Sequence, residues 1–152
     1  MKRALATLAL LALVGIAAAA DKPNFSGTWK MNPAKSAYGQ IPPPESFTRN
    51  IEHAEPSISI AEEQTGPGSQ PPSKRAMKTD GQPVMNEINN IPVKLTATWD
   101  GAALMANTNV ESMGVTFKDK MSLSTDGKEL TSVVQIESTA GSIELKIVFD
   151  KQ

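Results

Sequence analysis

Apolar and polar side chains alternate along most of the chain beyond residue 24. A period of two places one face of a β-strand in a core and the other in water, so this alternation predicts strands. No helical periodicity follows the N-terminal segment, and the expected fold class is therefore all-β. The expected strands cover residues 25–31, 47–53, 57–62, 74–79, 94–99, 103–110, 115–124, 130–137 and 143–149.

Turn-forming residues separate these strands. Asp80-Gly81, Asp100-Gly101 and Asp126-Gly127 each stand between two alternating runs, and an Ala-Gly-Ser sequence at 140–142 precedes the last run. Asp-Gly supplies the positive φ angles that tight hairpin turns require. Many short strands joined by hairpins are typical of an up-and-down barrel or a sandwich.

Two proline-rich stretches interrupt the pattern. Residues 39–45 contain three consecutive prolines, and residues 65–72 contain three prolines and two glycines. Proline lacks the backbone donor that a central strand needs, so both stretches are predicted to be loops. We expect the first to be a stiff segment crossing one end of the barrel and the second to be an exposed hairpin tip.

The first twenty residues follow a different pattern. Lys2 and Arg3 precede an unbroken run of mostly apolar residues over 4–16, and four alanines then lead to Asp21. This arrangement predicts a secretory signal peptide over residues 1–20, cleaved after Ala20, and an exported domain over residues 21–152. The run is short of the about 20 residues that a transmembrane helix needs, and no transmembrane segment is expected after cleavage. An uncleaved N-terminal anchor is the alternative.

Composition narrows the possible functions. The formal net charge is −1, so there is no basic excess to bind nucleic acid or an anionic membrane surface. The chain has no cysteine, which excludes disulfides, thiolate zinc sites and cysteine nucleophiles. It also lacks a nucleophile elbow, zinc-ligand spacing and a Gly-rich phosphate loop. We therefore expect a monomeric domain that is not an enzyme and uses no cofactor or metal.

The start of the exported domain carries a family resemblance. Phe25-Ser26-Gly27-Thr28-Trp29-Lys30-Met31 resembles the Gly-x-Trp first strand of the lipocalins and the similar opening of the fatty-acid-binding proteins. Residues 55–60, 98–104 and the hairpin ending at 149–150 look like later strands of the fatty-acid-binding type. The chain is also similar to the lipocalin-like domains of small exported bacterial proteins that open with Asn-Phe-Ser-Gly-Thr-Trp. The resemblance covers residues 24–151 and implies a calycin barrel: closed, antiparallel, up-and-down and of eight to ten strands.

Three departures from these families bear on function. The helical lid of the fatty-acid-binding proteins is not expected, because residues 32–46 contain four prolines. In that family an Arg and a Tyr on the last strand hold the ligand carboxylate, whereas the matching positions here are Ile147 and Phe149. Lipocalins pack a basic side chain across the first-strand Trp, and here only Lys146 and Lys151 can take that place.

Two charged residues interrupt apolar strand faces. Arg49 shares a face with Phe47 and Ile51, and Asp119 lies between Phe117 and Met121. A buried charge without a partner is very costly, so each residue needs a partner or water. Arg49 and Asp119 either pair inside the barrel, or form an anion anchor for a ligand with Asp119 behind Arg49. Otherwise both lie near the rim, or a bulge shifts the strand register.

The remaining candidate residues are apolar. Trp29 is expected in the core, and Trp99 in the core or the wall of a cavity. Small inward-facing residues such as Ala106 leave space that a ligand can occupy. The single histidine, His53, carries no metal or catalytic prediction. The candidate ligand-binding residues are Arg49, Trp99, Ala106, Phe117, Asp119 and Met121, and Gly27 and Trp29 are assigned structural roles.

Two functions follow from this sequence. The favoured hypothesis is an exported barrel, periplasmic or extracellular, that binds a small hydrophobic ligand in its interior. The alternative is a barrel with a filled interior that acts through its surface on a protein or on envelope material. An enzyme is the least favoured class, and a cluster of Arg49, Asp119 and His53 would revive it.

Overall fold

The computed structural model describes residues 21–152, and the predicted signal peptide lies outside the described residues. The described part is all-β, apart from one 3-10 turn, η1, at Glu111–Met113. The strands are β1 (Gly27–Met31), β2 (Ser46–Ala54), β3 (Ser57–Thr65), β4 (Ser73–Lys78), β5 (Val84–Ile88), β6 (Ile91–Asp100), β7 (Ala103–Val110), β8 (Val115–Leu123), β9 (Glu129–Ser138) and β10 (Gly141–Lys151).

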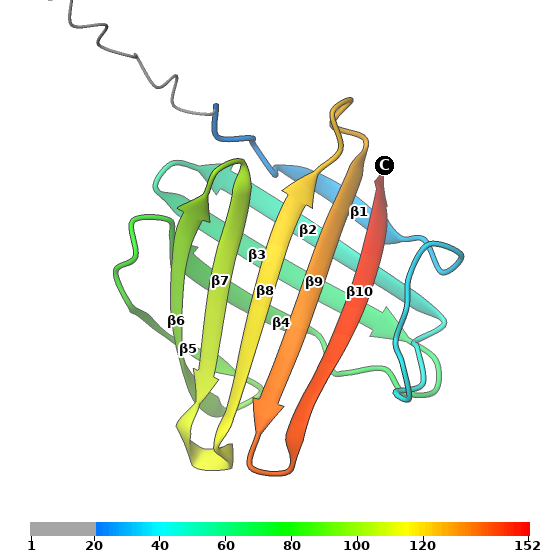
Figure 1. Cartoon of the computed structure of the whole chain (residues 1–152), viewed down its shortest axis with the longest axis vertical. Coiled ribbons are helices and arrows are strands. Elements are labelled where there is room, and N and C mark those ends of the chain that lie inside the picture. The colour runs from blue at the N-terminus through cyan, green and yellow to red at the C-terminus, as the bar shows by residue number, and fades with distance from the viewer. Residues whose placement is uncertain (1–20) are drawn as a thin grey trace, which may run out of the picture.

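The ten strands form one antiparallel sheet that curls into a nearly closed barrel (Figure 1). The strand order is β4-β3-β2-β1-β10-β9-β8-β7-β6-β5, so consecutive strands are neighbours except β4 and β5, and the first strand pairs with the last. Between β4 and β5 there is no strand pairing. The up-and-down barrel expected from the sequence is confirmed, with this one break in its wall.

Two sequence predictions were wrong at this break. Strand β5 was not expected, and Asp80-Gly81 was expected to form a tight hairpin turn. Instead the chain between β4 and β5 leaves the sheet, and Asp80 makes an isolated bridge to Thr98. Gly81 still has the positive φ, 81°, that its dipeptide suggested. A turn signal fixes local backbone geometry, whereas strand pairing depends on what the flanking residues pack against.

The other turns agree with the sequence. Asp100 pairs with Ala103 around Gly101, and the Asp126-Gly127 turn joins β8 to β9. The proline-rich residues 65–72 form the connection between β3 and β4, as predicted.

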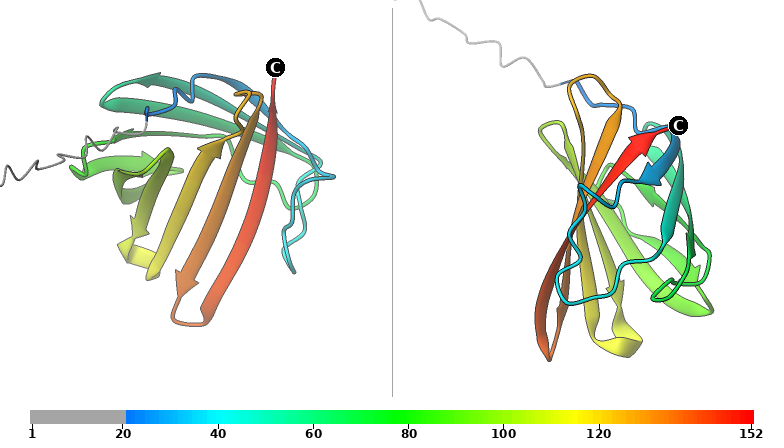
Figure 2. Two further views of the ribbon diagram at one scale, coloured as in Figure 1. Left: turned by 45° about the horizontal axis from the view of Figure 1, so that its top comes forward. Right: turned by 90° about the vertical axis from the view of Figure 1, so that its right-hand side faces the viewer.

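Two curved layers enclose the core. Figure 2 shows β1–β4 on one side and β6–β10 on the side facing them. Their inner faces supply a single apolar cluster, in which the side chains of Trp29, Ile60, Leu95, Leu104 and Phe149 are fully buried. Burial of alternate residues on nearly every strand is what the period-two pattern predicts.

Trp29 anchors the first strand in this core. Its indole Nε1–H donates to the Phe25 carbonyl at 2.9 Å, and the Lys151 ammonium lies 5.3 Å from the centre of its ring. Lys151 thus takes the place of the basic side chain that lipocalins pack across this Trp. Gly27 has φ of 142°, and a Cβ there would lie 3.0 Å from the Lys151 side chain. Glycine at this position lets Lys151 approach the ring.

The segment between β1 and β2 is irregular and contains no helix, as expected. Ala37 bridges to Lys146 of β10 through two backbone hydrogen bonds of 2.7 and 2.9 Å. The segment therefore continues the line of the short strand β1. Its proline-rich part packs on the β3–β4 loop, where a Cβ at Gly68 would lie 2.9 Å from the Pro42 carbonyl oxygen.

Candidate functional site: a charge cluster inside the barrel

Four charged side chains meet inside the barrel. Arg49 on β2, Glu62 on β3 and Arg75 on β4 point inward from three neighbouring strands, and Asp119 points inward from β8 on the other layer. Arg49 and Glu62 are direct cross-strand partners. Their side chains are 3% to 14% exposed, so the four charges are largely removed from water.

Glu62 is held by both guanidinium groups. Its Oε1 lies 2.8 Å from Nε of Arg49 and 3.2 Å from Nη2 of Arg75, and its Oε2 lies 2.6 Å from Nη1 of Arg75. Such charge-assisted bonds are among the strongest in proteins. Glu62 is therefore the carboxylate that holds the two arginines together.

Asp119 is held more loosely. Its Oδ1 accepts a short hydrogen bond from the Ser132 hydroxyl. Its Oδ2 lies 3.7 Å from Nη1 of Arg49 and 3.9 Å from Nη2 of Arg75, beyond hydrogen-bond length. The pairing of Arg49 with Asp119 inside the barrel, one of the sequence-based alternatives, is thus observed as a longer ion pair.

Arg49 is fixed by packing as well as by charge. Its guanidinium carbon lies 4.8 Å from the ring centre of Phe149 and 5.6 Å from that of Phe47. Nη1 also contacts the sulfur of Met121 at 3.6 Å. Aromatic faces attract a guanidinium, and desolvation strengthens that attraction.

The cluster controls the ionisation of its members. Burial alone would raise the pKa of the Glu62 carboxyl, but the guanidiniums of Arg75 and Arg49 outweigh it and lower this pKa to about 2. Burial likewise opposes the charge on Arg75, yet Glu62 and Asp119 raise the pKa of its guanidinium. Tyr38, half-buried nearby, has a pKa raised to about 12, mainly by burial. Glu62 and Arg75 are therefore charged at neutral pH.

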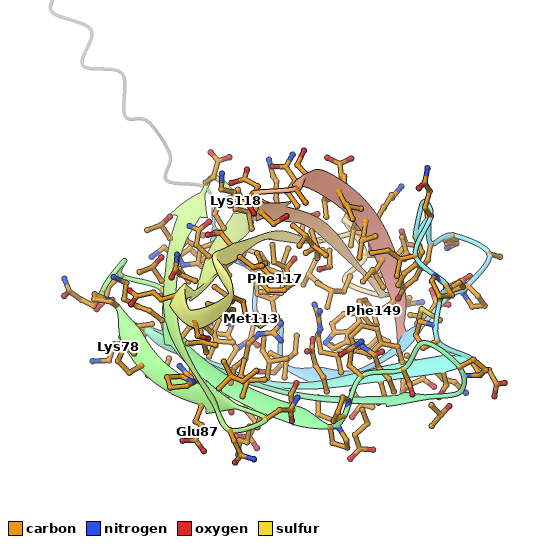
Figure 3. All side chains as sticks on the ribbon, turned by 90° about the horizontal axis from the view of Figure 1, so that it is seen from below. Lys78, Glu87, Met113, Phe117, Lys118 and Phe149 are labelled. Carbon is orange, nitrogen blue, oxygen red and sulfur yellow. The ribbon has the colours of Figure 1, made fainter. Side chains whose placement is uncertain are left out.

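One end of the barrel lets solvent reach the inner face beside this cluster. Val134 on β9 is the cross-strand partner of Asp119 on β8. Val134 and Phe117 are only half-buried. Figure 3 looks at this end and shows Phe117 directed into the barrel. We call this end, lined by inward-facing and half-buried residues, the open end; its residues are Ile88, Ile91, Thr108, Phe117, Val134 and Ile136.

The opposite end is closed by stacked rings. Phe25, His53 and Trp99 lie with ring centres 5.8 to 6.0 Å apart. Glu55 accepts hydrogen bonds from Trp99 Nε1 at 3.1 Å and Thr79 Oγ1 at 2.7 Å, and its Oε1 lies 2.9 Å from His53 Nε2. Trp99 and His53 thus belong to the closed end and are not brought to the charge cluster.

The other predicted ligand residues lie close to the cluster. Ala106 is the cross-strand partner of Asp119 on β7 and is buried. Met121 is fully buried beneath Arg49, and Phe117 lies one inward position from Asp119 toward the open end. Five of the six candidates, all except Trp99, are therefore grouped around one place.

Sequence reasoning missed Glu62 and Arg75. Glu62 is the last residue of its predicted strand and is followed by another glutamate. Arg75 stands in the weakly alternating run 74–79. The spacing of two could have indicated that both residues face inward. Glu62 follows Ile58 and Ile60 at this spacing, and Arg75 precedes Met77 by two.

The family carboxylate anchor is absent from its usual place. Ile147 and Phe149 are buried apolar residues on β10, as the sequence indicated. In the part of the chain from residue 21 onward, no group of three or more His, Asp or Glu side chains can hold a metal ion. The same residues contain no helix long and apolar enough to cross a membrane.

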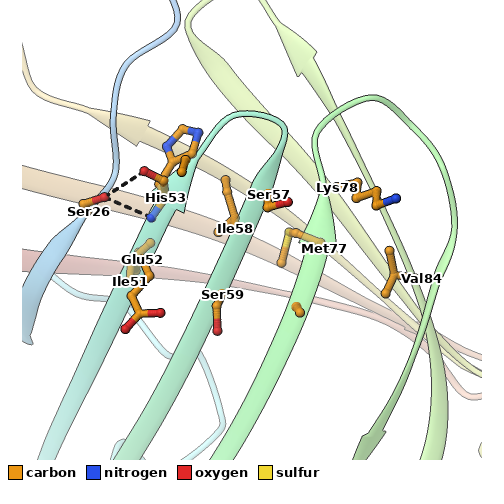
Figure 4. A pocket seen from close by; sticks show the side chains of 12 residues that line it. Ser26, Ile51, Glu52, His53, Ser57, Ile58, Ser59, Met77, Lys78 and Val84 are labelled. Atoms are coloured by element: carbon orange, nitrogen blue, oxygen red, sulfur yellow. Dashed lines mark hydrogen bonds between the residues drawn. The ribbon is translucent and has the colours of Figure 1, made fainter.

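A separate groove lies along β2, β3 and β4. Its lining combines outward-facing Glu52, Ser57 and Lys78 with buried Ile58 and Met77, and Figure 4 shows Ser26 beside it, bound to the backbone of His53. The Ser26 hydroxyl accepts from the His53 N–H at 2.9 Å and donates to the His53 carbonyl at 3.2 Å. None of the predicted ligand residues lines this groove.

Comparison with known proteins supports the fold. No protein-family model matches this sequence, and a search of curated proteins found no significant match. Among solved structures, a secretory abundant heat soluble protein from Ramazzottius varieornatus superposes with a TM-score of 0.65 at 16% identity, over 84% of this chain and 95% of that one. Fatty-acid-binding protein 1 from Echinococcus granulosus gives 0.61 at 13% identity, over 84% and 96%.

Zebrafish ileal bile acid-binding protein, solved with cholic acid, gives a TM-score of 0.60 at 12% identity, over 84% of this chain and 98% of that one. The fold is the calycin-like barrel of the fatty-acid-binding and lipocalin kind. Two of these three proteins are ligand-binding proteins by name, and none is named as an enzyme.

Proposed function

We propose that this chain is an exported barrel that binds a small hydrophobic molecule in its interior through the open end. The observation that carries the proposal is the contrast between the open end and the interior of the barrel. Inward-facing apolar side chains at the open end, among them Phe117, Val134 and Ile136, are half-buried, whereas inner-face residues nearer the middle, such as Leu104 and Met121, are fully buried.

Apolar surface that stays exposed to water on an inner wall is energetically unfavourable. Each Å² of apolar area removed from water stabilises a protein or complex by about 25 cal/mol. An apolar ligand seated among Phe117, Val134 and Ile91 would remove this surface from water. The mouth of a β-barrel is a common ligand site, and the fold shared with named ligand-binding proteins supports the proposal.

The second candidate is a barrel that acts through its surface. The observation in its favour is the charge cluster itself, because Arg49 and Arg75 reach across to Asp119 and join the two layers in the middle of the barrel. That bridge limits the depth to which a ligand can enter. The proposed site is accordingly the space between the cluster and the open end.

The test combines a search for a native ligand with a binding assay. Protein purified from its native source is examined by native mass spectrometry, and recombinant residues 21–152 are titrated with the uncharged dye Nile red. Thr108→Trp places a large side chain on the inner wall, beside its cross-strand partner Phe117. Asn107→Trp places the same side chain on the outer face of the same strand.

We expect saturable dye binding by the wild type and by Asn107→Trp, and at least about a tenfold weaker affinity for Thr108→Trp. A bound small molecule that the dye displaces would support the proposal further. Absence of both a bound molecule and saturable dye binding in the wild type would reject it in favour of the surface-acting barrel.

A further inference from the structure

The charge cluster is balanced, and this balance bears on the ligand's polar group. Two arginines and two carboxylates contribute no net charge when all four are ionised. Both Glu62 oxygens are already occupied by guanidinium donors. An incoming carboxylate would have to compete with Glu62 for the arginines and would lie beside Asp119, a like charge.

The unused hydrogen-bonding capacity of the cluster lies between Asp119 and the arginines. Among residues 21–152, Oδ2 of Asp119 has no hydrogen-bond donor, and the nearest nitrogens of Arg49 and Arg75 lie 3.7 and 3.9 Å away. An oxygen atom placed about 2.8 Å from both Oδ2 and a guanidinium nitrogen bridges such a separation. A hydroxyl suits this place because it donates to Oδ2 and accepts from the guanidinium, whereas a carboxylate can only accept.

The position of Asp119 makes this place reachable from the open end. Asp119 is paired with half-buried Val134 and is one inward position from half-buried Phe117. A chain lying along Phe117 and Val134 would bring its terminal group to Oδ2 of Asp119 before it reaches fully buried Met121.

We infer that the barrel selects an apolar molecule with an uncharged hydroxyl head group, which bridges Asp119 and the arginines, and that it discriminates against the corresponding carboxylic acid. This inference rests on the proposed function, since it assigns the head group of the ligand bound at the open end. The site differs in place and in charge from an anion anchor: it comes from β2, β3, β4 and β8 and has no excess of cations.

The experiment compares two probes that differ only in the head group. Hexadecan-1-ol and hexadecanoic acid compete with Nile red for residues 21–152 at pH 8, where the acid is ionised. The wild type should bind the alcohol at least about tenfold more tightly than the acid. Asp119→Asn removes one negative charge, keeps an oxygen that can accept from Ser132 and puts an amide nitrogen, which cannot accept, in the place of Oδ2. It should therefore raise affinity for the acid about tenfold and lower that for the alcohol by a similar factor.

The outcomes separate this inference from the proposed function. Equal affinity for alcohol and acid in the wild type, or tighter binding of the acid, would overturn the inference and leave hydrophobic binding intact. No displacement of dye by either probe, with no saturable dye binding, would reject the proposed function as well. The wild-type comparison decides the matter even where Asp119→Asn folds poorly, and Lys120→Asn, on the outer face of β8, serves as the surface-charge control.

Discussion

Glu62 is the residue on which the interior charges depend. It bonds both Arg49 and Arg75, and each arginine would be left with a single, longer ion pair to Asp119 without it. Breaking a buried pair by removing one partner costs about 3–5 kcal/mol, because the remaining charge stays buried without compensation. The cluster is therefore a place where one substitution has a large and pH-dependent effect.

We predict that Glu62→Gln lowers the free energy of unfolding by about 3–5 kcal/mol at pH 7. The pKa of Glu62 is lowered to about 2 from its ordinary 4.5, so its stabilising contribution is fully present above pH 4.5 and is lost as the pH falls toward 2. Urea unfolding at pH 7 and pH 3 should therefore show a much smaller pH difference for the variant than for the wild type. Glu63→Gln, exposed on the same strand, is the control, and an unchanged pH difference in Glu62→Gln would contradict the assignment.

We predict that Trp29→Ala destabilises the domain by about 3–5 kcal/mol, because the ring is fully buried and its Nε1–H bonds the Phe25 carbonyl. Chemical unfolding followed by circular dichroism measures the change. Trp29→Phe keeps most of the buried ring and should lose less than half as much. A loss below about 1 kcal/mol for Trp29→Ala would show that the first strand is not anchored through this residue.

At the scale of elements, the side chain of Asn86 bridges the break between β4 and β5. Asn86 on β5 accepts from the Ala76 N–H at 2.7 Å and donates to the Ala76 carbonyl at 2.9 Å, so its amide takes the place of a paired strand. The sequence could not reveal this arrangement. Asn86 belongs to a short run between two turns, and its role depends on a backbone group that only the folded barrel brings to it.

We predict that Asn86→Ala costs about 1–2 kcal/mol, the value of two hydrogen bonds to a partly exposed backbone. The loss should be local, so hydrogen exchange at the amide of Ala76 should speed up more than exchange at the amides that pair β6 with β7. Asn107→Ala, exposed on β7, is the matched control. Unchanged exchange at Ala76 in Asn86→Ala would contradict the bridging role.

At the scale of the molecule, the barrel has two unlike ends joined by a ten-stranded wall that is broken between β4 and β5. The period-two pattern predicted nine of the ten strands, and it predicted the inward faces because burial acts on every second residue. It could not predict which end is open, because that depends on strand lengths, on the segment 32–45 and on the stacking of Phe25, His53 and Trp99. Two of the four charges in the cluster were predicted, because Arg49 and Asp119 stand out on apolar strand faces. Glu62 and Arg75 were not predicted, because they become partners only through the register of β3 and β4.

The closed end also bears on export. Phe25 is fully buried, its N–H donates to Nδ1 of His53 at 3.2 Å, and its carbonyl accepts from Trp29. Cleavage after Ala20 would leave Phe25 and the four residues before it in place. Cleavage beyond Asn24 would remove a group that closes this end, because the side-chain amide of Asn24 donates to the His53 carbonyl. We therefore predict that N-terminal sequencing of exported protein begins within two residues of Asp21. An exported protein that retains Met1 would contradict cleavage, and one that begins after Asn24 would contradict the closed end as described.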